Sequence, residues 1–149
     1  MQFQLLPPLQ RPLLAKFYKT HRAGMRARGE AQMWVAKEQE IVAGMCLTQV
    51  AGGHWLSGLF VAPDQRGRGV AGGLIEASLK TVEGSVWLFC DPDLVAFYQR
   101  SDFVKALDLP RELADRLAVP VEAQPFETGQ DRRRRFGGRA GAVGILDPE

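Results

Sequence analysis

Successive apolar segments, joined by connections of only a few residues, are the feature that most constrains this chain. Residues 32–37 (QMWVAK), 41–50 (IVAGMCLTQV) and 54–61 (HWLSGLFV) have the β-branched and aromatic content that is typical of strands. The residues between them are turn-like and far too few for the crossover that parallel neighbours need. We therefore expect an antiparallel meander in the first half of the chain.

Helical periodicity lies on both sides of this meander. Apolar residues recur at helical spacing before it and after Pro63, and Asp91-Pro92 has the N-cap and first-position residues that open a helix. The expected elements are a strand at 2–6, a helix at 9–18, the meander, a helix at 71–80, a strand at 85–90, a helix from 91 to 98, a strand at 103–109 and a helix at 111–118. This order predicts an α/β fold with a sheet of mixed direction and helices on its faces.

Bulk properties restrict the function without naming it. The chain has 149 residues, which suits one ordinary domain, and its net charge of +2 is too small to imply a nucleic-acid or membrane partner. We find neither the pattern of a secretory leader nor an apolar stretch near the ~18 residues of a membrane span. Cys46 and Cys90 lie in apolar strand-like runs without metal-ligand spacing. We expect a cytoplasmic protein with buried thiols and no metal site.

A glycine-rich loop, QRGRGVAGG at residues 65–73, follows the last strand of the meander and opens a helix. The spacing Gly67-x-Gly69-x-x-Gly72 matches the dinucleotide-binding fingerprint. Glycines allow backbone N–H groups to converge near a helix N-terminus, whose partial positive charge suits a pyrophosphate. Two arginines add full charges beside these amides. The loop therefore predicts a ligand that carries phosphate.

A protein that binds a nicotinamide dinucleotide is one alternative for this loop. Asp91 lies 19 residues after Gly72, near the place of a ribose-binding carboxylate. However, antiparallel strands precede the loop, and only 77 residues follow Gly72 in the 149-residue chain. That length is too short for the rest of a doubly wound dinucleotide domain.

The wider stretch 59–79 (LFVAPDQRGRGVAGGLIEASL) resembles the acetyl-CoA-binding region of the GNAT superfamily of N-acetyltransferases. In that family a strand ending in L-x-V leads through a proline-containing turn to R-x-x-G-x-G/A and a helix with an early leucine. The segment 91–103 (DPDLVAFYQRSDF) is similar to the family's helix that ends in a tyrosine, with a Gly-Phe pair five residues on. The matching loop positions are Arg66, Gly69, Ala71 and Leu74. The resemblance covers 31–103 and implies a GNAT-like mixed, mostly antiparallel central sheet flanked by helices.

The resemblance also implies a reaction: direct transfer of an acetyl group from acetyl-CoA to a primary amine of a small molecule or peptide. It implies that the backbone of residues 59–61 pairs with the pantetheine arm like an added strand, with the Leu59 N–H facing the thioester carbonyl. Tyr98 matches the tyrosine that protonates the departing thiolate. The implied coenzyme-binding residues are Leu59, Phe60, Val61, Arg66, Gly67, Arg68, Gly69, Val70, Ala71, Gly72, Asp91 and Tyr98.

The sequence departs from the family pattern at several positions. Many members carry a carboxylate where this chain has Trp55, and no acidic residue occurs between Glu40 and Asp64. His54 is a candidate base, but strand alternation places it on the face opposite Leu59 unless a bulge intervenes. The base is therefore unassigned, and a non-catalytic acetyl-CoA sensor is a second hypothesis.

Two smaller departures follow near the matched tyrosine. Asp91 replaces a frequent asparagine, which preserves a helix cap. Asp102 replaces the glycine of the Gly-Phe pair, at a site that favours positive φ.

The C-terminal part has a different character. We expect residues 1–118 to form the GNAT-like domain and residues 119–149 to form a Gly/Arg-rich tail or arm that completes the sheet or contacts a second copy in a homodimer. Arg132 to Arg135 would suit RNA or another phosphate-rich surface. The segment 119–149 nevertheless carries five arginines against five acidic residues. This balance argues against a nucleic-acid partner.

Overall fold

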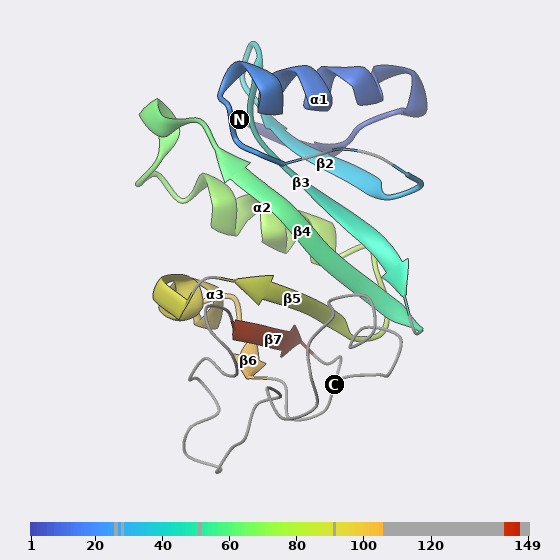
Figure 1. Cartoon of the computed structure of the whole chain (residues 1–149), viewed down its shortest axis with the longest axis vertical. Coiled ribbons are helices and arrows are strands. Elements are labelled where there is room, and N and C mark those ends of the chain that lie inside the picture. Colours follow the sequence, from blue (N-terminus) through green and yellow to red (C-terminus); the bar gives the residue numbers. More distant parts are fainter. Residues whose placement is uncertain (26, 28, 51, 91, 106–141, 147–149) are drawn as a thin grey trace. The chain divides into compact units, whose positions relative to one another are not determined.

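The computed structural model describes residues 1–25, 27, 29–50, 52–90, 92–105 and 142–146 (Figure 1). It confirms an α/β fold with a mixed, mostly antiparallel sheet and helices. The elements are β1 (Gln2–Leu5), η1 (Pro8–Gln10), α1 (Arg11–Thr20), β2 (Gln32–Lys37), β3 (Ile41–Val50), β4 (Gly53–Val61), η2 (Pro63–Gln65), α2 (Val70–Leu79), β5 (Val86–Cys90), η3 (Pro92–Leu94), α3 (Val95–Gln99), β6 (Val104–Lys105) and β7 (Ala142–Leu146), where η marks a short 3₁₀ helix.

The chain divides into two compact units. The first consists of Met1–Thr48 and Leu56–Val82, and the second of Gln49–Trp55 and Glu83–Glu149. Strand β4 therefore contributes its beginning to the second unit and its end to the first.

The meander predicted from the sequence lies mainly in the first unit. β1 pairs antiparallel with β2, and β2 pairs antiparallel with β3, with Trp34 opposite Met45 in the register. β4 is the neighbour of β3 on its other side. The prediction of consecutive neighbouring strands is confirmed.

Helices cover both faces of this sheet. Four consecutive residues of β2, Met33 to Ala36, are buried, which requires cover on both sides because side chains alternate along a strand. One core cluster joins α1 to the face of β2 that carries Met33 and Val35, and its α1 members are Leu14, Phe17 and Tyr18. Phe3 of β1 pairs with Ala36, whose side chain lies on the face opposite to that of Val35. The Phe3 ring contacts α2 at Gly73, where an added Cβ would come within 2.6 Å of the ring. The two helices therefore pack against opposite faces of β2.

The second unit contains a small antiparallel sheet. β5 pairs with β7, with Leu88 opposite Gly144, and β7 pairs with β6. The start of β4 lies close to Ser85, since a Cβ added at Gly53 would overlap the Ser85 carbonyl oxygen. The His54 N–H donates a 2.9 Å hydrogen bond to the same oxygen. β7 falls within the segment expected to be a tail or arm. The helix expected at 111–118 and most of that segment lie outside the described residues.

Other expectations can be compared directly with the structure. Both cysteines are buried and free of disulfides, as predicted. Asp102 has φ 71°, the left-handed conformation that the glycine of the family pattern adopts without strain. The predicted strand at 103–109 is seen as β6 over Val104–Lys105, and its remaining residues lie outside the described part. In that described part, no helix is long and apolar enough to cross a membrane.

A pair of Gly→Ala substitutions tests the packing of α1. Gly44→Ala should destabilise the fold by about 1–3 kcal/mol, because the new methyl group would overlap Cδ1 of the fully buried Leu14. Gly72→Ala should instead stabilise it by about 0.5–1 kcal/mol, because this helical position has no neighbour within 4 Å of the new Cβ. Urea unfolding of both variants measures the difference. Equal changes in the free energy of unfolding would show that Leu14 does not pack directly against Gly44.

Candidate functional site

The end of β4 leads directly into the glycine-rich loop. The Ala62 N–H donates a 2.8 Å hydrogen bond to the Val42 carbonyl, and η2 follows. Gly67 and Gly69 then have φ 80° and 75°, and α2 starts at Val70. No atom lies within 4 Å of a Cβ built at either glycine. The left-handed backbone, and not crowding, therefore requires glycine at both positions.

The N-terminus of α2 presents backbone donors without a side-chain cap. Gly69 is the N-cap, and no side chain hydrogen bonds there. The Gly73 N–H donates to the Gly69 carbonyl at 3.0 Å, so the amides of residues 70–72 precede the first helical hydrogen bonds. These amides and the helix dipole give the exposed loop before α2 a partial positive charge. Such a helix end suits a phosphate or pyrophosphate.

Both arginines of the loop are tied to their neighbours. The Arg66 Nε donates a 2.9 Å hydrogen bond to the Val61 carbonyl, and the guanidinium lies 5.0 Å above the centre of the Phe60 ring. The Arg68 Nη1 donates at 2.8 Å to Oε1 of Gln65. Because each guanidinium has five N–H donors, these contacts leave others for an anion. Arg66 therefore links the end of β4 to the loop and keeps its charge beside it.

Strand β4 is irregular immediately before the residues expected to meet the pantetheine arm. Gly58 has φ 69° in the middle of the strand, and its carbonyl accepts a 2.6 Å hydrogen bond from the Tyr18 hydroxyl of α1. Leu59 and the next two residues are half-buried. The Phe60 ring lies 5.9 Å from the Phe17 ring and 5.8 Å from the His21 ring. Aromatic packing from α1 thus supports the end of β4.

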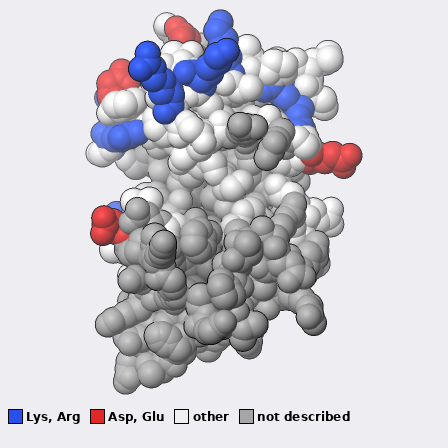
Figure 2. Space-filling view, viewed as in Figure 1, with Lys and Arg blue, Asp and Glu red and all other residues white. Residues whose placement is uncertain are grey.

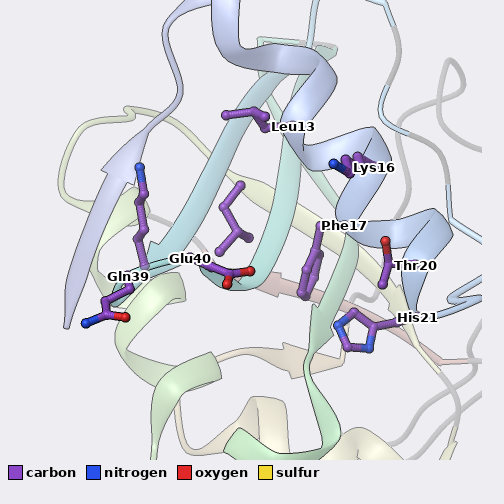
Figure 3. A pocket seen from close by; sticks show the side chains of 9 residues that line it. Leu13, Lys16, Phe17, Thr20, His21, Gln39 and Glu40 are labelled. Carbon is purple, nitrogen blue, oxygen red and sulfur yellow. The ribbon is translucent and has the colours of Figure 1, made fainter.

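A pocket lies between α1 and the turn that joins β2 to β3 (Figure 3). Its volume is about 320 Å³. Phe17 from α1 and Glu40 from the turn face each other across it (Figure 3). A neighbouring hollow of about 640 Å³ shares His21 and Glu40 and extends to Asp64 and Gln65 of η2. This hollow connects the pocket with the start of the glycine-rich loop.

The surface of the first unit is basic near α1. Figure 2 shows Lys and Arg side chains gathered over the region where α1 lies in Figure 1. The helix carries Arg11, Lys16 and Lys19 and no acidic residue, and the exposed Arg22 follows it. An anionic ligand near this helix would meet a favourable potential.

Tyr98 lies in the second unit, within α3. Its ring is buried between Phe97, at 4.9 Å, and Phe103, at 5.9 Å. Burial raises the pKa of the Tyr98 phenol above its usual range, and the nearby Cys90 thiol raises it further. The hydroxyl is therefore a protonated donor at neutral pH. Asp91, also expected at the coenzyme, lies outside the described residues.

His54, the candidate base, lies in the part of β4 that belongs to the second unit. Its Nδ1 is buried and has no hydrogen-bond partner among the residues that the structure describes. Trp55, at the position of the family's carboxylate, is half-buried. The left-handed Gly58 interrupts the regular alternation of β4. Alternation therefore does not decide the face of His54 relative to that of Leu59.

The sequence did not lead us to the pocket residues or to the Tyr18 contact. Tyr18 reads as an apolar position of an amphipathic helix, and Gly58 as one glycine among many. An isolated glycine inside a strand pattern is a known sign of a bulge or a close approach, and this sign was available at Gly58. The lining by Lys16, His21 and Glu40 depends on contacts between segments far apart in the chain. No local sequence pattern predicts such contacts.

A tyrosine titration tests the burial described above. The chain has two tyrosines, Tyr18 and Tyr98, and burial raises the pKa of both. Native protein should therefore show no phenolate absorbance at about pH 10, where half of a free tyrosine is ionised. In urea both should titrate there. Because the tyrosines ionise more easily in the unfolded chain, their burial stabilises the fold fully below about pH 10. The free energy of unfolding then falls as the pH rises further. Half-ionised native protein at pH 10 would contradict the structure.

Comparison with known proteins places this geometry in a family. The family model of the acetyltransferase (GNAT) domain matches residues 7–123. Similar solved structures include Rv2747 from Mycobacterium tuberculosis in complex with CoA, with 11% identity, TM-score 0.65 and 100% of each chain covered. Escherichia coli ElaA has 14% identity and TM-score 0.65, covering 98% of this chain and 99% of its own. The ribosomal-protein-S18-alanine N-acetyltransferase from Escherichia coli has 16% identity and TM-score 0.62, covering 98% and 92%.

At these identities the structures show a shared fold, while the family model matches most of the chain directly. No curated protein sequence matches the chain significantly. The nicotinamide-dinucleotide alternative loses its support, because the same glycine-rich loop now lies inside an acetyltransferase domain. The chain belongs to the GNAT acetyltransferase family.

Proposed function

We propose that the protein is an N-acetyltransferase that moves an acetyl group from acetyl-CoA directly to a primary amine. The observation that carries the proposal is the uncapped N-terminus of α2 behind two left-handed glycines, placed directly after β4 in a chain of the acetyltransferase family. The similar structure of Rv2747 contains CoA, which supports a CoA-type ligand. The acceptor is an amine of a small molecule or of a peptide.

The loop and the start of α2 bind the pyrophosphate of the coenzyme. Backbone amides from Gly67 to Gly72, with Val70 and Ala71 between them, supply hydrogen bonds to the phosphate oxygens. Arg66 and Arg68 add charge at the exposed edge of the loop. Each such contact contributes roughly 0.3–1 kcal/mol when exposed, so binding needs several together.

The backbone of Leu59, Phe60 and Val61 pairs with the pantetheine arm as an added strand would. The Leu59 N–H then faces the thioester carbonyl. Attack of an amine on this carbonyl carbon places negative charge on the oxygen, and a fixed backbone donor stabilises that charge. Because the donor is part of the main chain, it needs no change of protonation state to act.

Collapse of the tetrahedral intermediate breaks the C–S bond and releases the thiolate of CoA. Tyr98 donates its phenolic proton to this sulfur. The amine loses its own proton before or during attack, either in solution or through a water chain. His54 is the alternative base, supported by its unpartnered Nδ1 in the described part of the chain.

An acetyl-CoA sensor without chemistry is the second candidate. The observation that favours it is Trp55 at the position where many family members have a carboxylate. The two candidates agree on the coenzyme site and differ only in turnover. A cytoplasmic location and a homodimer formed through residues 119–149 are further parts of the proposal.

Substitution of Tyr98 tests the catalytic assignment. Tyr98→Phe should slow turnover at least about tenfold, since a positioned general acid typically contributes about 10²–10⁴ in rate. Its affinity for acetyl-CoA should remain within about twofold, because the ring and its contacts with Phe97 and Phe103 are kept. Release of free CoA across a panel of amines measures turnover, and calorimetric titration with acetyl-CoA measures binding.

The outcomes separate the candidates. An unchanged turnover number in Tyr98→Phe would remove Tyr98 from the mechanism but leave acetyl transfer intact. Silence of the unsubstituted protein across a broad amine panel, with tight acetyl-CoA binding, would favour the sensor. Absence of acetyl-CoA binding would contradict both.

A further inference from the structure

The left-handed residue in β4 is built around one buried contact with α1. A strand residue normally has negative φ, yet Gly58 has φ 69°. A Cβ built at Gly58 would lie 2.9 Å from the Tyr18 hydroxyl oxygen. Glycine is therefore required twice, by the backbone conformation and by the close approach of Tyr18.

The contact itself is a short hydrogen bond from a buried donor. The Tyr18 hydroxyl donates at 2.6 Å to the Gly58 carbonyl, and only 2% of Tyr18 is exposed. The Cys46 thiol lies beside the same hydroxyl. The hydrogen bond to the Gly58 carbonyl uses the single proton of the Tyr18 hydroxyl.

The Gly58 carbonyl and the Leu59 N–H belong to one peptide unit. No described peptide bond is cis, so this unit is trans and its C=O and N–H point in opposite directions. A hydrogen bond that holds the carbonyl towards Tyr18 therefore holds the Leu59 N–H away from it. Polarisation of the carbonyl by the hydroxyl also makes the N–H a stronger donor.

We propose that Tyr18 is a positioning residue of the transferase: its hydroxyl, through the Gly58 carbonyl, aims and polarises the Leu59 N–H that meets the thioester carbonyl. This inference rests on the proposed function, because it takes the acetyl group of acetyl-CoA as the partner of Leu59. Burial keeps the Tyr18 phenol protonated, since its pKa is raised above the usual range, so the donor is present throughout neutral pH.

A purely structural hydroxyl would behave differently. If Tyr18 served only to satisfy a buried carbonyl, its loss would lower stability and leave the bound thioester unchanged. The decisive readout is therefore the thioester carbonyl itself. Its infrared stretch, isolated by ¹³C labelling of the acetyl carbonyl, falls as the hydrogen bond to its oxygen strengthens.

The experiment compares the full chain with Tyr18→Phe, each saturated with labelled acetyl-CoA. In the unsubstituted protein the stretch should lie below that of free acetyl-CoA. In Tyr18→Phe at least half of this shift should be lost. Turnover should fall about tenfold or more with KM for acetyl-CoA within about twofold, since one oxyanion donor is typically worth 10²–10³ in rate and here it is weakened rather than removed.

The outcomes distinguish the inference from the function on which it rests. A clear shift in the unsubstituted protein that persists in Tyr18→Phe overturns the role of Tyr18 and leaves the Leu59 assignment intact. No shift in the unsubstituted protein overturns the Leu59 assignment, and the role of Tyr18 with it. A shift that is lost in Tyr18→Phe supports both.

A stability control and a second substitution complete the design. Val86→Ala removes buried methyl groups in β5, outside the core cluster that contains Tyr18, and should lower the melting temperature while it leaves the stretch unchanged. If Tyr18→Phe does not fold, 3-fluorotyrosine incorporated in a Tyr98→Phe background labels Tyr18 alone. Its more acidic hydroxyl should move the stretch further in the direction of the binding shift. An unmoved stretch would overturn the inference.

Discussion

Helix α1 approaches the sheet at two glycines, and the geometry of the first unit depends on this approach. Leu14, fully buried, lies over β3 at Gly44, where no larger residue leaves room for it. One helical turn later, Tyr18 reaches β4 and hydrogen bonds with Gly58. The same helix face therefore closes the core and shapes the strand that leads to the coenzyme loop. Packing and the proposed chemistry are joined through one element.

Backbone groups form most of the proposed site. The amides at the start of α2 and at Leu59 act as donors without side-chain ionisation, and glycine conformations set their directions. Tyr98, the side chain assigned to proton transfer, is buried and carries its proton at neutral pH until it donates it. We therefore attribute binding and charge stabilisation to preorganised dipoles, which cost no rearrangement during the reaction.

Local patterns were sufficient for much of the fold. Strands β2 to β5, helix α2 and the glycine-rich loop before it follow from apolar periodicity and from the glycine spacing of residues 65–73. The conformation of Asp102 also agrees with the expectation drawn from the family pattern. These features are encoded over a few neighbouring residues, so a single sequence can reveal them.

Contacts across the chain were beyond such patterns. The hydrogen bond between Tyr18 and Gly58 joins residues 40 positions apart, and the pocket lining combines α1 with the turn after β2. Strand β7 pairs with β5 from the segment for which we expected a tail or arm that completes the sheet or contacts a second copy. Its five residues, AVGIL, are too short to distinguish a strand from a loop without the partner strand.

The central claim is that one ligand, acetyl-CoA, occupies both the α2 N-terminus and the backbone at Leu59. The most direct test is NMR of the ¹⁵N-labelled chain titrated with CoA and with acetyl-CoA. The account predicts that the amides of Gly69, Val70 and Ala71 respond alike to both ligands. The Leu59 amide should move further downfield with acetyl-CoA, because only this ligand carries the thioester carbonyl. Identical responses of Leu59 to the two ligands, or unmoved amides at the start of α2, would contradict it.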